Sequence, residues 1–207
     1  MIRSLPPLSR RSALSALAAA GLATPANARA AVQDVALETE LGIIRVRAEV
    51  ARAPLSAGDF LKYVDGGLYA AGGFYRTVRP DTDVINPVRI DVIQGGLLDE
   101  SRNLAPVAHE TTRMTGLRHL NGTISLARDA PGTGSASAIF ICIGDQPALD
   151  FGGHRNPDGQ GFAAFGKVIA GMDVARAIWA RPVKGKPGSA EGQTLASPVR
   201  ILRARRL

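Results

Sequence analysis

Short apolar runs that alternate with clusters of turn-forming residues constrain the fold of this chain more than any other feature. In residues 35–39 and 44–50 apolar and polar side chains alternate, and Glu40-Leu41-Gly42 separates the two runs, which predicts a β-hairpin. Further strand-like runs follow between Gly, Pro, Asn and Asp residues, at residues 73–78, 89–94, 122–127, 138–143, 162–168 and 198–202. Many short strands in series predict a mainly β fold, either a closed barrel or a sandwich.

Two segments have helical rather than strand-like spacing. Residues 54–66 carry one apolar stripe, and Ser56 is expected to cap this helix with Asp59 three positions on. A second short helix is predicted over residues 172–180. The sequence shows no internal repeat and no linker, and its 207 residues suit a single domain.

The composition limits what can hold such a fold together. The chain has one cysteine, Cys142, which excludes an intramolecular disulfide and a multi-cysteine zinc site. Because Cys142 lies in the apolar run 139–143, we expect a buried, unreactive thiol. The net charge of +7 comes from the two ends, since residues 31–175 carry 13 basic and 17 acidic side chains. No domain-wide positive field exists, and no nucleic-acid partner is expected.

Residues 1–30 have the features of an export signal peptide. They contain four arginines and no acidic residue, then the apolar run 13–23, then small residues at cleavage spacing in Ala26-Asn27-Ala28 and Ala28-Arg29-Ala30. Ser9-Arg10-Arg11-Ser12-Ala13 resembles the twin-arginine export motif. We therefore predict a periplasmic protein whose mature domain spans residues 31–207. No later apolar run is long enough to span a bilayer, so no transmembrane segment is expected.

Generic site motifs are weak in this sequence. Three histidines occur without metal-binding spacing: His109, His119 and His154. The spacing of Asp150, Asn156 and Asp158 matches no calcium loop, so neither a metal nor a cofactor is expected. Gly132-Thr133-Gly134-Ser135 lacks the lysine of a phosphate-binding loop, which favours a surface turn.

Five segments, taken in their order along the chain, carry a specific resemblance. They are Phe74-Tyr75-Arg76, Val92-Ile93-Gln94-Gly95-Gly96, Gly122-Thr123-Ile124-Ser125-Leu126-Ala127, Ile139-Phe140-Ile141, and Phe165-Gly166-Lys167-Val168 with Gly171-Met172-Asp173-Val174. Over residues 35–202 the chain resembles a bacterial, exported cyclophilin-type peptidyl-prolyl cis/trans isomerase. The resemblance implies a closed eight-stranded antiparallel barrel capped by two short helices. Side chains fill the interior of such a barrel, so the active surface is expected on its outside.

The resemblance also implies the reaction and the residues that serve it. Rotation about an X-Pro bond needs no nucleophile, metal or cofactor. Arg76 would approach the lone pair of the twisted proline nitrogen, Gln94 would bind the substrate backbone, and Phe140 would form the proline pocket. Five further positions are expected to bind the substrate: Val92 and Leu149 in the pocket, the main chain of Ala127 and Arg128 beside the extended peptide, and Phe162.

Several positions depart from the family pattern. They are Asp91-Val92 in place of Phe-Met, Ala138 in place of Gln, Ala148 in place of an aromatic residue, and Phe162 in place of His or Tyr. Residues 151–161 form one apparent insertion, and a second separates Arg76 from Gln94 with Pro80, Asp81, Asp83, Asn86 and Pro87. The second insertion is expected to loop beside the groove and to change substrate access.

The expected function is isomerisation of X-Pro bonds in exported proteins, which assists their folding. The expected partners are proline-containing peptides, unfolded exported proteins and cyclic-peptide cyclophilin inhibitors, and a monomer is expected. One alternative is a proline-peptide-binding or chaperone module with little catalysis. Another is a surface-anchoring protein whose basic end docks on anionic lipid or polymer through Arg200, Arg203, Arg205 and Arg206, although a solvated strand edge has the same pattern.

Overall fold

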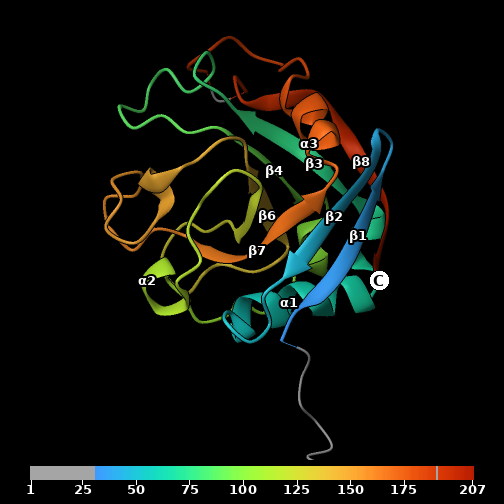
Figure 1. The fold of residues 1–207 in the computed structure, drawn as a ribbon. Helices are drawn as coiled ribbons and strands as arrows, with labels where there is room; N and C mark the ends of the chain where they lie inside the picture. Colours follow the sequence, from blue (N-terminus) through green and yellow to red (C-terminus); the bar gives the residue numbers. More distant parts are fainter. Residues whose placement is uncertain (1–30, 190) are drawn as a thin grey trace, which may run out of the picture.

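Eight antiparallel strands close into a barrel in the computed structural model, which describes residues 31–189 and 191–207 (Figure 1). The strands are β1 (Gln33–Thr39), β2 (Gly42–Ala48), β3 (Gly72–Val78), β4 (Val92–Leu97), β5 (Thr123–Leu126), β6 (Ala138–Cys142), β7 (Ala163–Ala170) and β8 (Thr194–Arg206). Their order around the barrel is β1-β2-β7-β5-β6-β4-β3-β8. The predicted barrel is confirmed and the sandwich alternative is wrong. The predicted export segment, residues 1–30, lies outside the described residues.

Helices cover both ends of the barrel. The helical segments are α1 (Pro54–Asp65), η1 (Leu68–Ala71), η2 (Glu100–Arg102), α2 (Thr112–Thr115), η3 (Pro147–Leu149) and α3 (Met172–Trp179). Figure 1 shows α1 and α3 at opposite ends. The Phe60 ring of α1 packs against Tyr69 and Phe165 at centroid distances of 5.8 and 5.1 Å. On α3, Ala175 and Ile178 are buried against the core. Both predicted capping helices are therefore present.

The barrel interior is filled by every second residue of the strands. In the β1–β2 hairpin, Val35 and Leu37 stand opposite Val46 and Ile44, and all four side chains are fully buried. Strand side chains alternate between two faces, so the neighbouring residues of each strand point away from this core. Any groove for a ligand must therefore lie on the outer face of the barrel.

The start of α1 differs from the sequence expectation. The helix begins with Pro54 after Ala53, which makes no side-chain cap, so the prediction that Ser56 is the cap is wrong. Instead, the Glu110 carboxylate accepts the backbone N–H groups of Leu55 and Ser56 at 3.1 and 2.7 Å, and the Ser56 hydroxyl at 2.7 Å. A residue 54 positions away in the sequence therefore satisfies the first turn of α1.

Two strands have other boundaries than the sequence predicted. Strand β4 begins at Val92, three residues later than expected, because the Ile90 N–H donates to the Asp83 carboxylate and not to a neighbouring strand. Strand β8 is longer than residues 198–202 and runs to Arg206, since its basic end pairs with β1. Arg205 and Arg206 also form ion pairs with Glu38 and Asp65.

The two glycines after Gln94 belong to β4, which extends past the predicted end at residue 94 to Leu97. A Cβ atom at Gly95 would lie 2.7 Å from the Phe74 ring. Gly96 has a φ of +145°, and a Cβ there would overlap the Ser137 carbonyl. Glycine at both positions therefore allows β4 to lie tightly between β3 and β6.

The described residues contain no helix long and apolar enough to cross a membrane. Within residues 31–189 and 191–207, no three His, Cys, Asp or Glu side chains gather closely enough to hold a metal ion. Cys142 is fully buried, which confirms the sequence expectation, and burial raises the pKa of its thiol far above the usual value. A thiol in this state is a packing group and not a nucleophile.

Candidate active site

Three predicted catalytic residues form one row across neighbouring strands. In the pairing of β3 with β4, Arg76 stands opposite Gln94, and in the pairing of β4 with β6, Gln94 stands opposite Phe140. Directly paired residues project from the same face of a sheet, so the three side chains lie side by side. The intervening residues, such as Ile93 and Ile141, point into the barrel core. The row therefore lies on the outer face of the barrel.

An apolar cluster lies next to this row, separate from the barrel core. We call it the outer apolar cluster, and it consists of Val78, Ile90, Val92, Phe140, Cys142 and Leu149, with Ala127 and Phe162 packed against it. A second row lies two residues further along the same three strands. In it, Val78 of β3 pairs with Val92 of β4, and Val92 pairs with Cys142 of β6. The structure thus gathers every predicted pocket residue, Val92, Phe140, Leu149 and Phe162, in one place. Such a cluster suits a small apolar ring.

Arg76 is held by two glutamine side chains. Its Nη1 donates to Oε1 of Gln94 at 2.8 Å, its Nε donates to Oε1 of Gln193 at 3.0 Å, and its Nη2 also donates to Gln193. Of the five N–H groups of an arginine, two have no partner among the described residues. Burial lowers the pKa of Arg76, and the charge of Arg155 acts in the same direction. An arginine nevertheless stays protonated at neutral pH, so a partly desolvated cation lies at the edge of the cluster.

The Gln94 side chain is bonded to two neighbouring side chains on the outer face of the barrel. While its Oε1 accepts from Arg76, its Nε2 donates to the Tyr75 hydroxyl at 3.3 Å. Tyr75 precedes Arg76 at an irregularity in the pairing of β3, so both side chains lie partly exposed on this side. One N–H of the Gln94 amide has no partner in residues 31–189 and 191–207, and it is available to a ligand.

Phe140 is fixed from two sides. Its ring stacks on His119 at a centroid distance of 5.8 Å and an angle of 14°, and it meets the Phe162 ring edge-on at 5.2 Å and 86°. Both arrangements are favourable for aromatic rings. The ring that would form the wall of a proline pocket is therefore held in one orientation.

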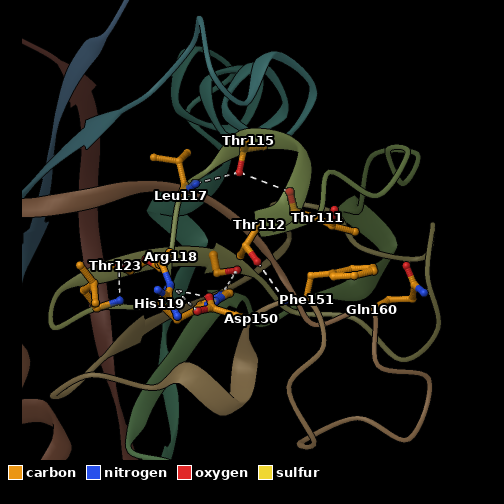
Figure 2. A network of polar contacts seen from close by, with 12 residues as sticks. Thr111, Thr112, Thr115, Leu117, Arg118, His119, Thr123, Asp150, Phe151 and Gln160 are labelled. Carbon is orange, nitrogen blue, oxygen red and sulfur yellow. Dashed lines mark hydrogen bonds and ion pairs between the residues drawn. The ribbon is translucent and has the colours of Figure 1, made fainter.

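His119 is buried beneath the pocket in a polar network (Figure 2). Its Nδ1 contacts Oδ1 of Asp150 at 2.8 Å, its backbone N–H donates to the same oxygen at 2.9 Å, and its Nε2 contacts the Ser125 hydroxyl at 3.1 Å. Burial lowers the pKa of His119 although Asp150 opposes this. For Asp150, hydrogen bonds from His119 and Arg118 outweigh burial and lower the pKa. The neutral, fully buried His119 stacks on Phe140, and the ionised Asp150 holds the histidine in place.

The segment after β5 forms the other edge of the site. Arg128 lies over the Phe162 ring at 5.3 Å, and it donates to both carboxylate oxygens of Asp158 at 2.7 and 2.9 Å. These bonds lower the pKa of Asp158 to about 2. The Ala127 N–H donates to the Ala138 carbonyl, but the Ala127 carbonyl and the Arg128 N–H have no partner in the described part of the chain. An extended peptide could pair with them.

An open pocket of about 200 Å³ lies beside Gln94. It is lined by Gln94, Ala127, Arg128, Asp129, Thr133, Ser135, Ser137 and Ala138. Ala138 stands where the family pattern has a longer side chain, and it leaves this space open. Val92 is buried within the outer apolar cluster, and Ala148 is only partly buried on η3. Ala138 and Val92, two of the departures from the family pattern, therefore lie at the open pocket and in the outer apolar cluster.

Sequence reasoning missed the residues that support the site from behind. Sequence patterns single out His119 and Asp150 only as candidate metal or calcium ligands, and no motif contains Gln193. No regular spacing in the sequence links these residues to the site. Gln193, for example, is 117 positions from Arg76. Tyr75 could have been found, because it lies beside Arg76 in a strand.

The comparisons with known proteins point to one family. The family model for cyclophilin type peptidyl-prolyl cis-trans isomerase/CLD matches residues 34–206. Peptidyl-prolyl cis-trans isomerase A of Dickeya dadantii is 34% identical over 158 residues, which cover 75% of this chain and 75% of that protein. Peptidyl-prolyl cis-trans isomerase cyp18 of Streptomyces antibioticus is 33% identical over 163 residues, or 76% of this chain and 87% of that protein.

Solved structures share the fold. A cyclophilin type peptidyl-prolyl cis-trans isomerase of Cryptosporidium parvum superposes with a TM-score of 0.64 at 18% identity, over 85% of this chain and 98% of that chain. The C. parvum protein was also solved in the presence of the dipeptide Ala-Pro, with a TM-score of 0.64 at 18% identity, over 84% of this chain and 99% of that one. The closed barrel thus defines a protein of the cyclophilin fold. Together with the family match over residues 34–206, this shows that the chain belongs to the cyclophilin-type peptidyl-prolyl cis/trans isomerases, which are isomerase enzymes.

Proposed function

We propose that this isomerase accelerates rotation about X-Pro peptide bonds in exported proteins and thereby assists their folding. The barrier to this rotation is about 20 kcal/mol and arises from amide resonance. Uncatalysed exchange takes roughly tens to hundreds of seconds, which is slow enough to limit folding. No covalent bond breaks, so a catalyst needs only to hold the proline and to stabilise the twisted amide.

The position of Arg76 beside the outer apolar cluster carries this proposal. The proline ring packs against Phe140, and the guanidinium of Arg76 lies in the same row, two strands away. When the C–N bond twists, its nitrogen loses resonance and gains a lone pair that accepts a hydrogen bond. An N–H group of Arg76 donates to that lone pair, and this bond is strongest in the twisted state.

The neighbouring groups fix the peptide on either side of the proline. Gln94 donates its remaining amide N–H to the substrate backbone. The free carbonyl of Ala127 and N–H of Arg128 pair with the extended residues that precede the proline. Val92 and Phe162 complete the apolar contact with the ring, while Leu149 is fully buried and packs within the same cluster.

A proline-peptide-binding module with little catalysis is the second candidate. The observation that favours it is the Phe162 ring, which packs on Phe140 and under Arg128 and has no polar atom to donate to a substrate carbonyl. Without that donor, the groove would bind peptides and leave their exchange rate nearly unchanged.

Cis-to-trans exchange of an Ala-Pro peptide, measured with the full-length chain, tests the function. We expect acceleration that falls on the order of ten- to a hundredfold in Arg76→Ala, because a hydrogen bond to a charged group contributes roughly 1.5–3 kcal/mol. Arg203→Ala, an exposed cation on β8, serves as the matched control. A cyclic-peptide cyclophilin inhibitor should abolish the acceleration. A folded protein that binds the peptide without accelerating exchange would support the second candidate.

The proposed location is the periplasm, reached through the twin-arginine route, and the proposed clients are unfolded exported proteins. The protein is proposed to act as a monomer. Cell fractionation after expression of the full chain tests the location, with Arg10→Lys/Arg11→Lys as the variant. Replacement of both arginines should retain the protein in the cytoplasm. Periplasmic protein in equal amount from both chains would argue for another export route.

A further inference from the structure

Gln193 is joined to the site by both its main chain and its side chain. It lies directly before β8, and its carbonyl accepts the Thr77 N–H at 2.9 Å, which fixes its backbone against β3. Its side-chain oxygen accepts from two nitrogens of Arg76. Two of the three hydrogen bonds that hold the guanidinium therefore come from this one residue.

The chemistry of the neighbours fixes the orientation of the Gln193 amide. Arginine has only donors and an ionised aspartate has only acceptors. Oε1 of Gln193 must therefore face Arg76, and Nε2 donates to Oδ1 of Asp83 at 3.3 Å. An amide satisfies both partners and stays neutral, whereas a carboxylate at this position would neutralise Arg76 and repel Asp83. The positive charge of Arg76 thus remains available to the substrate.

Asp83 is itself held by an ion pair that joins the two long loops. Arg155, in residues 151–161, donates through Nη1 and Nη2 to the Asp83 carboxylate, and the two side chains are 12% and 4% exposed. Arg155 also donates to the Val88 carbonyl, and Asp83 accepts the Ile90 N–H. An ion pair this deeply buried, with further hydrogen bonds to the Val88 carbonyl and from the Ile90 N–H, holds both loops in a defined geometry.

We propose that Gln193 is a positioning residue for Arg76, and that the Asp83–Arg155 pair between the two inserted loops holds Gln193 in place. This inference rests on the proposed role of Arg76 at the proline nitrogen. An arginine side chain has several rotatable bonds, and a small displacement of a catalytic group lowers its rate contribution strongly. With Gln193 replaced, Gln94 would be the one remaining hydrogen-bond partner of the guanidinium within the described residues.

The main test is Gln193→Leu in the full-length chain, with exchange of an Ala-Pro peptide followed by NMR at saturating and limiting peptide. Leucine keeps the approximate volume of the side chain and removes both polar atoms. We expect the saturated exchange rate to fall on the order of tenfold, while the peptide dissociation constant stays within about twofold because the outer apolar cluster is intact. Gln33→Leu is the matched control, because the Gln33 side chain on β1 bonds, among the described residues, to Asp34, Leu207 and Arg206.

A double-mutant cycle separates positioning from a general structural effect. In the Arg76→Ala background, Gln193→Leu should lower the exchange rate no further, because no guanidinium remains to be placed. A full additional loss in that background would show that Gln193 acts independently and would overturn the proposal.

The contribution of the two loops is tested by replacing both charges together. Asp83→Asn/Arg155→Gln removes the ion pair without leaving one buried charge alone, so the protein should remain folded. We expect the saturated rate to fall by about two- to fivefold, with peptide affinity unchanged. An unchanged rate would show that the loops do not position Gln193.

The Arg76 Nε–H resonance reports on the geometry independently of turnover. Its exchange with solvent should be slow in the unmodified chain and in Gln33→Leu, and at least about tenfold faster in Gln193→Leu. If the unmodified chain does not accelerate isomerisation, the proposed function fails, and this measurement still decides the positioning. If the Arg76 Nε–H exchanges as slowly in Gln193→Leu as in the unmodified chain, the proposed positioning role of Gln193 is wrong.

Discussion

Phe162 illustrates how one side chain both completes and limits the site. Its ring holds Phe140 edge-on and lies under Arg128, so the residue closes the outer apolar cluster. The family pattern has His or Tyr at this position, and both side chains have a polar group that phenylalanine lacks. Packing is therefore retained at Phe162 while a hydrogen-bond donor toward the substrate is absent.

Phe162→Tyr should raise kcat/KM for an Ala-Pro peptide. The added hydroxyl can donate to the substrate carbonyl, and a neutral hydrogen bond is worth about 1 kcal/mol, or roughly fivefold in rate. Phe151→Tyr, a partly buried phenylalanine beside Arg113, controls for the added hydroxyl. A value unchanged or lowered in Phe162→Tyr would show that this position does not reach the substrate.

Helix α1 shows how an element can depend on a distant residue. Its first turn begins at Pro54, and its free N–H groups are satisfied by Glu110 and not by a local cap. The carboxylate lies at the positive end of the helix dipole, where a negative charge is favourable. The same side chain ties the segment before α2 to the end of the barrel that α1 covers.

Glu110→Ala should lower the free energy of unfolding by about 2 kcal/mol, because it leaves two backbone N–H groups and the Ser56 hydroxyl without their partner. Urea denaturation followed by circular dichroism measures this. Glu191→Ala, at an exposed glutamate, should change the midpoint little. Equal midpoints for the two variants would contradict the capping role of Glu110.

For the molecule as a whole, the buried His119 and the half-buried His109 make stability depend on pH. Burial lowers the pKa of both His119 and His109 below the ordinary value of 6.5. The unfolded chain takes up protons as the pH falls through 6.5, and the folded chain resists them until a lower pH. The stabilisation is therefore complete above pH 6.5 and is lost progressively below it, toward the folded-state pKa values.

Urea unfolding between about pH 8 and pH 5 measures this dependence. We expect the free energy of unfolding to fall across the acidic part of the range, and to fall less steeply in His119→Asn, where one of the two histidines is removed. Asp150 adds a loss only at lower pH, since its pKa lies below 3.8. Identical slopes in the unmodified chain and in His119→Asn would contradict the burial of a neutral His119.

Local patterns in the sequence predicted the class of fold and the residues that line the outer face of the candidate site. Local alternation predicted most strands and both capping helices, and the ordered motifs predicted Arg76, Gln94 and Phe140, since each lies in a short segment with its own pattern. Periodicity did not predict where β4 begins or how far β8 extends, because pairing with neighbouring strands sets those limits.

Contacts between distant segments of the chain hold these residues in place. Glu110 caps a helix 54 positions away, Gln193 binds Arg76 across 117 positions, and Arg155 binds Asp83 across 72. Such contacts have no periodicity, since they form only when barrel closure and loop packing bring distant segments together. A local pattern reports which face of a strand is apolar, whereas the partner of a buried polar group depends on the whole fold.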